Sequence, residues 1–287
     1  MGTDLLRPST GAVAGVDWGA TLTKLAVRRP DASLHFELLP ADDGEACRRL
    51  LAEQGVVRVG ATGGGAAALA RQLGGAVAVV DEFEAWAAGA AALLAEAGSS
   101  PAPRHLLVSL GTGTSVLRVD GDRVARVGGT ALGGGTLLGL AAGLIGTSDF
   151  ARLTELAGRG SRSEVDLLVS EVYPEGDRPL PGDFIAASFG KLARRLRAGE
   201  PVAPADLAHA LMGLVAENVS RICVGLAAAS GVSRIVFCGS TLRGNPTLVG
   251  GLAILTRALG CEPVFPAQGE FAAALGALRL ACEGASG

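Results

Sequence analysis

The segment that follows the first apolar stretch carries a carboxylate, two threonines and a lysine within eight residues, Asp17-Trp18-Gly19-Ala20-Thr21-Leu22-Thr23-Lys24. A carboxylate at the end of a strand can hold a hydrated Mg²⁺ beside phosphate oxygens. Gly19 lets the backbone approach an anion, Thr21 offers a hydroxyl and an amide, and Lys24 can place positive charge on a phosphoryl group. An ordinary hairpin turn with a surface Asp and Lys explains the same residues equally well.

Two more glycine- and threonine-rich segments follow further along the chain. Residues 111–115 (GTGTS) come directly after an apolar run, and they fit either an anion nest of amides and hydroxyls or a plain hairpin turn. Residues 128–136 (GGTALGGGT) lead into an apolar helical pattern. Three consecutive glycines lose much conformational entropy on folding, and a helix N-terminus presents N–H groups to an anion. We therefore interpret residues 128–136 as a phosphate-binding loop rather than a flexible connector.

Candidates for proton transfer and for substrate binding lie near these turns. Residues 81–84 (DEFE) place three carboxylates after a predicted strand and at the start of a predicted helix. Acids at that position favour the helix dipole, and one that faces a cleft could act as general base on a hydroxyl. Arg126 interrupts a strand of Val, Ala and Gly and is a candidate partner for an anionic group. Residues 237–245 (FCGSTLRGN) fit either a wall of an adenosine pocket or an ordinary β–α turn.

The elements that must position these residues form a repeated pattern. Strands are predicted at residues 13–17, 24–28 and 33–39, and the same three-strand opening recurs at residues 105–110, 114–119 and 123–127. The first turn of each half is rich in Gly and Thr, and Ser and Pro at residues 98–104 mark a linker. We predict an α/β protein with two related domains, residues 11–100 and 101–287, and a nucleotide cleft between them.

Hydrophobic periodicity predicts the remaining elements. Helices are expected at residues 44–53, 82–97, 135–145, 149–158, 162–171, 184–198 and 203–229, between the strands at 235–239 and 263–265, and from residue 271 onward. Strands are expected at residues 56–61, 76–80, 235–239 and 263–265. A Pro-rich loop is expected at residues 174–183.

Composition argues against several classes of function. The net charge is −3 and the basic residues near Lys191 recur at helical spacing, so we expect a solvated helix face and no nucleic-acid partner. Apolar stretches are interrupted before the roughly 20 residues needed to span a bilayer, and residues 1–10 lack the features of a secretion signal and are expected to be a disordered tail. The five cysteines show no zinc-ligand spacing and are expected to be reduced in a cytoplasmic protein.

Taken in order, these segments resemble the type II pantothenate kinases, the group that includes the animal enzymes and the staphylococcal one. The resemblance extends from Gly15 to Ala277, and its most specific part is DEFEA followed by GTGTS and VGGTxLGGGT. Further matches are GVDWGATLTK, LPGDFIAASFG, IVFCGS and FAAALGALRL. The resemblance implies two ribonuclease H-like domains of the actin-like ATPase type. It also implies transfer of the γ-phosphate of ATP, with Mg²⁺, to the primary hydroxyl of pantothenate, the first committed step towards coenzyme A.

The resemblance also assigns roles residue by residue. Glu82 matches the catalytic base, Ser115 and Arg126 match substrate contacts, and Asp17 would serve Mg²⁺ through ATP. The positions that match ATP contacts are Asp17, Trp18, Gly19, Ala20, Thr21, Leu22, Thr23, Lys24, Thr112, Gly134, Gly135, Thr136, Leu137, Leu138, Phe150 and Ser240. Members of the family are dimeric, and residues 203–229 correspond to their interface helix, so a homodimer is expected.

Trp18 and Ala20 depart from the pattern, because the family usually has a smaller apolar residue and a glycine there. Ala20 fits the turn if its φ is negative, and the sequence offers no explanation for Trp18. Two other functions stay open. One is a kinase of the same fold for pantetheine, a related pantoyl compound or a sugar, although the zinc-binding cysteine cluster of one sugar-kinase group is missing. The other is a non-catalytic nucleotide-binding regulator, against which the presence of both Glu82 and Lys24 argues.

Overall fold

The computed structural model describes residues 11–41, 43–74, 77–99, 104–177 and 184–283. It contains two five-stranded sheets with the same topology, in the orders β3-β2-β1-β4-β5 and β8-β7-β6-β11-β12. In each sheet three antiparallel strands come first, and two parallel strands then join at the side of the first one. The predicted three-strand repeat is therefore confirmed. The strands are β1 (Ala12–Trp18), β2 (Leu22–Arg28), β3 (Leu34–Pro40), β4 (Val56–Thr62), β5 (Val77–Val79), β6 (Arg104–Leu110), β7 (Thr114–Asp120), β8 (Arg123–Thr130), β11 (Arg234–Cys238) and β12 (Glu262–Val264).

Helices cover both faces of each sheet. The main helices are α1 (Gly44–Glu53), α2 (Ala66–Leu73), α3 (Glu82–Glu96), α4 (Gly134–Leu144), α5 (Phe150–Ala157), α8 (Pro204–Ser230), α9 (Pro246–Ala258) and α10 (Ala272–Glu283). Successive residues of a strand point to opposite faces, so Ala12 and Ala14 pack with α1 and α2 while Val13 packs with α10. In the second sheet Leu106 faces the core with α8, and Leu107 faces α3.

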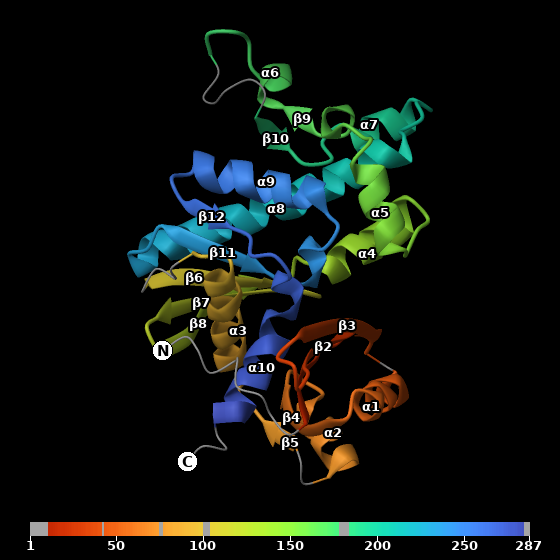
Figure 1. Cartoon of the computed structure of the whole chain (residues 1–287). Helices are drawn as coiled ribbons and strands as arrows, with labels where there is room; N and C mark the ends of the chain where they lie inside the picture. Colours follow the sequence, from red (N-terminus) through yellow and green to blue (C-terminus); the bar gives the residue numbers. More distant parts are fainter. Residues whose placement is uncertain (1–10, 42, 75–76, 100–103, 178–183, 284–287) are drawn as a thin grey trace.

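Helix α10 lies between the two halves, beside α3 and against the first sheet (Figure 1). Its backbone comes into direct contact with its neighbours at four glycines. A Cβ built on Gly15 of β1 or on Gly60 of β4 would lie 1.8 or 2.1 Å from a carbonyl oxygen of α10. A Cβ on Gly276 would lie 1.7 Å from the carbonyl oxygen of Ala85, and one on Gly89 would lie 1.7 Å from that of Ala272. Only glycine permits these contacts, because no side-chain rotation relieves a clash with backbone.

Two predicted helices, at residues 162–171 and 184–198, are wrong over much of their length. The structure has a short 3-10 turn (Arg162–Glu164), β9 (Leu167–Leu168), α6 (Val169–Val172), β10 (Ile185–Ala187) and α7 (Leu192–Arg197). Asp166 is fully buried and accepts hydrogen bonds from the Arg162 side chain and the Phe189 N–H. The bond from Phe189 ties Asp166 to a segment 23 residues further along the chain, and this contact overrides the local helical pattern. Helix α2 was not predicted.

Four sequence predictions lie wholly or partly outside the described residues. These are the tail at residues 1–10, the strand at 76–80, of which residue 76 is not described, the linker at 98–104, of which 100–103 are not described, and the Pro-rich loop, of which 178–183 are not described. Within the described part of the chain, one helix, α8, is long and apolar enough to cross a membrane, and 56% of its most apolar window is buried inside the fold. Burial of that kind is typical of a core helix.

Replacing Gly276 by alanine should destabilise the protein by about 3 kcal/mol, because the new methyl group must force α10 away from α3. Gly139→Ala in α4 is the matched control, since a Cβ there meets nothing within 4 Å and alanine favours the helix by about 0.5–1 kcal/mol. Chemical denaturation monitored by circular dichroism measures both. Equal stability of the two variants would contradict the close approach.

Candidate active site

A cleft with a volume of about 1610 Å³ lies between the two halves. The ends of β1 and β2 and the start of α3 line it from one side, and the turns after β6, β8 and β11 line it from the other. Sites for single drug-sized ligands usually measure roughly 300–1,000 Å³. The cleft therefore has room for a nucleotide and a second small molecule.

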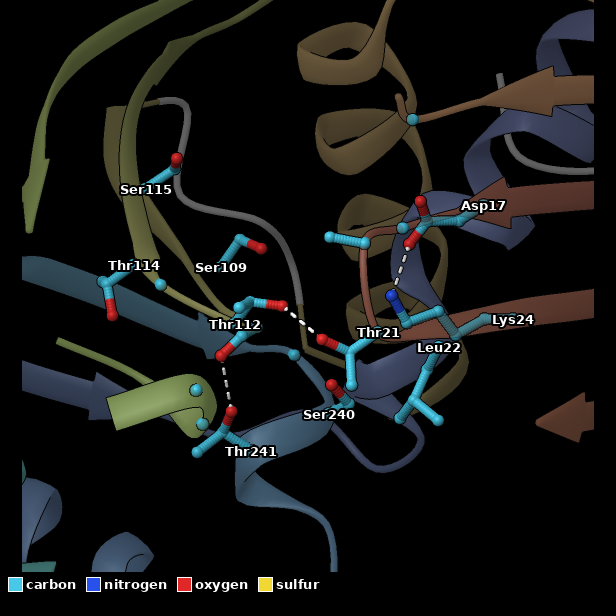
Figure 2. A pocket seen from close by; sticks show the side chains of 18 of the residues that line it. Asp17, Thr21, Leu22, Lys24, Ser109, Thr112, Thr114, Ser115, Ser240 and Thr241 are labelled. Atoms are coloured by element: carbon cyan, nitrogen blue, oxygen red, sulfur yellow. Dashed lines mark hydrogen bonds and ion pairs between the residues drawn. The ribbon is translucent and has the colours of Figure 1, made fainter. Parts of the chain in front are cut away.

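A buried ion pair joins the end of β1 to the start of β2. Asp17 and Lys24 are cross-strand neighbours, and the Lys24 Nζ lies 3.1 Å from the Asp17 Oδ2 (Figure 2). Both residues are less than one-tenth exposed. Burial raises the pKa of Asp17, and the ammonium of Lys24 opposes that effect. Because a buried charge without a partner is costly, each side chain depends on the other.

Trp18 has a structural explanation that its sequence position did not reveal. Its indole ring lies on two glycines: a Cβ on Gly65 would lie 2.4 Å from the ring, and one on Gly44 would lie 3.0 Å from it. The Gly65 N–H also donates to the Trp18 carbonyl at 3.1 Å. The large side chain thus ties the first turn to the starts of α1 and α2. The backbone of Ala20 has a negative φ, so alanine fits where the family usually has glycine.

The second turn faces the first across the cleft. The Thr21 and Thr112 hydroxyl oxygens lie 2.8 Å apart in a hydrogen bond, and Figure 2 shows the two side chains pointing toward one another. The Gly111 N–H donates to the Gly113 carbonyl, and the Thr114 hydroxyl donates to the Leu132 carbonyl at 2.7 Å. Two threonine turns from different halves of the chain therefore meet at one point.

The three glycines at the start of α4 pack directly on that second turn. A Cβ on Gly133 would lie 2.7 Å from the Thr112 carbonyl oxygen, and one on Gly135 would lie 2.9 Å from the Thr112 Cγ2. The Gly134 N–H donates to the Gly111 carbonyl, and the Gly135 N–H donates to the Thr112 carbonyl. Close packing thus accounts for the glycines, and these two amides already have partners within the protein.

Residues from three further segments also line the cleft. Leu138 of α4, Phe150 at the start of α5 and Ser240 after β11 all contribute to its wall. Gly239 has a φ of 115°, and a Cβ there would lie 2.2 Å from the Leu110 carbonyl oxygen. The turn after β11 therefore requires glycine to bring Ser240 beside the second turn.

Glu82 begins α3 and faces the cleft beside the Asp17–Lys24 pair. Asp81 caps the helix by accepting from the Phe83 and Glu84 N–H groups. The cleft walls withdraw hydration from Glu82 and raise its pKa, and the negative charges of Asp17 and Asp81 act in the same direction. Lys24 and a hydrogen bond from Trp86 lower it. A carboxyl group with a raised pKa is suited to accept a proton near neutral pH.

Arg126 and Ser115 lie together on neighbouring strands. Gly129 of β8 pairs with Ser115 of β7, and a Cβ on Gly129 would lie 2.9 Å from the Arg126 Nη2. The missing side chain lets the guanidinium lie over the β8 backbone, and Arg126, Gly129 and Ser115 all line the cleft. The arrangement provides a cation and a hydroxyl for an anionic group.

The structure brings together nearly all of the predicted site residues, since all but Thr23, Thr136 and Leu137 line the cleft. Leu137 is fully buried in the hydrophobic core of the second half, and Thr23 is buried in the first sheet. The Thr136 hydroxyl donates to the Ala131 carbonyl. The side chains of these three residues therefore support the loops rather than face the cleft.

The turn Gly63-Gly64-Gly65 also lines the cleft and was not predicted from the sequence; it is called the third turn below. It follows β4, the parallel neighbour of β1. A Cβ on Gly63 would lie 2.7 Å from the Asp17 Oδ1, and its φ is 83°. The run of glycines after a strand was the available signal, because the carboxyl ends of neighbouring parallel strands meet at one sheet edge. Other lining residues that were missed are Leu38, Ala41, Trp86, Ser109, Ala151 and Thr154.

Among the described residues, no group of three or more His, Cys, Asp or Glu side chains is placed to hold a metal ion. All five cysteines are free, and three of them, Cys47, Cys223 and Cys238, are buried. Burial raises the pKa of the Cys47 thiol to about 11. Buried thiols of this kind are unreactive.

Solved structures similar to this one share its fold at low sequence identity. Component A of the (R)-2-hydroxyglutaryl-CoA dehydratase of Acidaminococcus fermentans matches with a TM-score of 0.66 and 19% identity, covering 97% of this chain and 100% of that chain. A ROK family glucokinase from Streptomyces griseus, solved with glucose and AMPPNP, matches with a TM-score of 0.57 and 16% identity, covering 95% of this chain and 100% of that chain. The predicted actin-like ATPase fold is confirmed.

Sequence comparison identifies the family. The type II pantothenate kinase of Staphylococcus aureus (strain USA300) is 32% identical over 266 residues, which cover 93% of this chain and 98% of the relative. The Fumble family model matches residues 20–279, a range that includes the second and third turns, Glu82 and Arg126. The chain therefore belongs to the Fumble family, the family of the type II pantothenate kinases.

Proposed function

We propose that the protein is a pantothenate kinase that transfers the γ-phosphate of ATP to the primary hydroxyl of pantothenate, giving 4'-phosphopantothenate, in the first step of coenzyme A biosynthesis. The observation that carries the proposal is the position of Glu82, which lies beside the Asp17–Lys24 pair in a cleft lined by the first turn, the second turn and Gly63-Gly64-Gly65. The 32% identity to a type II pantothenate kinase supports the choice of acceptor.

ATP would bind along the turns of both halves. The first and second turns provide hydroxyls and amides for the phosphates, and Leu138, Phe150 and Ser240 provide the wall for the adenosine. Two similar structures were solved with the ATP analogues ADPNP and AMPPNP, which supports a nucleotide in this cleft. The Thr21–Thr112 hydrogen bond joins the two phosphate-facing turns, so domain closure over ATP would bring groups from both halves onto the same phosphates.

Mg²⁺ fits the residues present. It commonly binds through one or two carboxylates together with substrate phosphates, and Asp17 is a buried carboxylate at the phosphate end of the cleft. When bound with ATP, Mg²⁺ would offset charge on the transferring phosphoryl group.

Glu82 would accept the proton of the acceptor hydroxyl as that oxygen attacks the γ-phosphorus. The bond from the γ-phosphorus to the β,γ-bridging oxygen breaks, and ADP leaves with that oxygen. Lys24 would place its ammonium near the negative charge of the transferring group, and the backbone of the turns would hold the phosphates. Arg126 and Ser115 would bind the carboxylate end of pantothenate, which keeps the acceptor hydroxyl toward Glu82.

We also propose a cytoplasmic homodimer, as expected from the family. Most of α8 packs within its own chain, and the residues it leaves exposed include Asn218, Arg221 and Gly225. An interface on this helix would use that strip.

Glu82→Gln should lower kcat by roughly 10²–10⁴-fold, the range for loss of a general base. The variant should be as stable as the wild type at neutral pH or more so, because the fold disfavours the charged form of Glu82. Steady-state ADP production with pantothenate and thermal denaturation measure the two effects. Glu84→Gln, at an exposed position on the same helical turn, is the control and should keep wild-type turnover. Near-normal turnover in a folded Glu82→Gln enzyme would contradict the base assignment.

Arg126→Ala should raise KM for pantothenate by about 10–100-fold, the loss of a charged hydrogen bond, while KM for ATP changes little. The same variant should lose its preference for pantothenate over pantetheine, which has no carboxylate. Arg123→Ala, at an exposed position of the same strand outside the cleft, serves as control. A parallel loss of ATP and pantothenate affinity would instead indicate a structural role.

Asp81→Asn should move the acidic limb of the kcat/KM profile to lower pH. Asp81 raises the pKa of Glu82 through its charge, and asparagine removes that charge but still caps the helix. Because the base must be ionised, activity is lost as pH falls through the pKa of Glu82, and a lower pKa extends activity to more acidic pH. An unchanged limb would show that Glu82 does not control it.

A further inference from the structure

Helix α3 places a tryptophan directly behind the proposed base. Trp86 follows Glu82 by four residues, so both lie on the same side of the helix, and both line the cleft. Helical side chains lean toward the N-terminus, which directs the Trp86 ring over the turn that begins with Glu82. The spacing therefore places the two side chains next to each other on the helix surface.

The Trp86 side chain is held by packing, and the Glu82 side chain is not. Trp86 is only 5% exposed and packs in the cluster formed by α3, α10 and the second sheet. Glu82 is open to the cleft and has no such packing. An indole N–H can only donate, and the four-residue spacing on α3 puts that of Trp86 within reach of the Glu82 carboxylate. A hydrogen bond from Trp86 also lowers the pKa of Glu82. The packed ring can therefore orient the carboxylate.

The charges around Glu82 act on its carboxylate in different directions, so a hydrogen bond is needed to hold the carboxylate in one position. Lys24 attracts the carboxylate, while Asp17 and Asp81 repel it, and Arg126 lines the same cleft from β8. Lys24 is already paired with Asp17 at 3.1 Å. Without a hydrogen bond from another side chain, the carboxylate of Glu82 would be attracted toward Lys24 and away from an acceptor hydroxyl.

We propose that Trp86 is a positioning residue of the kinase: its indole N–H holds one carboxylate oxygen of Glu82 and leaves the other oxygen free for the acceptor hydroxyl. The inference deepens the proposed function and rests on Glu82 as the base. Trp86 does not touch the substrates in this role and acts only through Glu82.

The kinetic test is Trp86→Phe, which removes the donor and keeps an aromatic ring in the core. It should lower kcat roughly tenfold, less than loss of the base itself, with KM for ATP unchanged. The acidic limb of the pH profile should move to higher pH, because the lost hydrogen bond favoured the charged carboxylate. A purely structural role of Trp86 would not move that limb.

Trp18→Phe is the matched control, because it makes the same chemical change at the other tryptophan of the cleft. It should leave the acidic limb in place, whatever it does to the rate. An equal shift of the limb in both variants, or no shift in Trp86→Phe, would overturn the proposal.

A second test needs no activity. Trp18 and Trp86 are the only two tryptophans of the chain, so Trp18→Phe makes Trp86 the sole source of tryptophan emission. Emission should change as Glu82 takes up a proton, with a midpoint above 4.5, the ordinary value for a glutamate. The change should vanish in Trp18→Phe/Glu82→Gln, with circular dichroism showing that both proteins stay folded over the titrated range.

Persistence of the emission change in the double variant would show that Trp86 does not contact Glu82, and the proposal would fail. If instead the emission test succeeds but pantothenate gives no ADP, the contact is present and the proposed kinase activity is what fails. The two tests therefore separate the positioning role from the function on which it rests.

Discussion

The structure depends on the contact between the backbone of α10 and three other elements. Gly15 and Gly60 bring the first sheet against one side of this helix, and the crossing with α3 is closed by Gly89 and Gly276. Asp17 lies at the end of β1, and Glu82 begins α3. One helix, held at van der Waals distance, therefore fixes the spacing between the buried ion pair and the carboxylate opposite it.

The electrostatics of the site follow from that spacing. Two carboxylates and one ammonium lie near one another in the cleft, and the ammonium is paired with the buried Asp17 while Glu82 is open to the cleft. Glu82 consequently keeps a proton affinity higher than that of an ordinary glutamate, while Asp17 is held in an ion pair. The same chemical group thus serves two purposes, and the environment decides which residue does which.

Much of this organisation could be predicted from the sequence, and the exceptions have physical causes. The repeat of three strands is a local pattern with clear turn residues, so nearly every strand was located within two residues. The predictions for residues 162–171 and 184–198 were wrong because Asp166 and Arg162 bind partners far away in the sequence, Phe189 and Glu217. The role of Trp18 could not be predicted, because its ring packs on Gly44 and Gly65, which are distant in the sequence and leave room for it by having no side chain. The division of the chain near residue 100 stays a prediction, and α10 complicates it by packing on the first sheet.

The position of α10 in the chain also has a consequence for protein synthesis. The first sheet is complete by β5, yet the helix that covers its inner face comes only after the whole second sheet. At the usual translation rate of 5–20 residues per second, roughly 10 to 40 s separate β4 from α10. During that interval the face that carries Val13 and Ala26 has no native cover. The nascent first half is therefore the part of this protein on which a ribosome-associated chaperone would act.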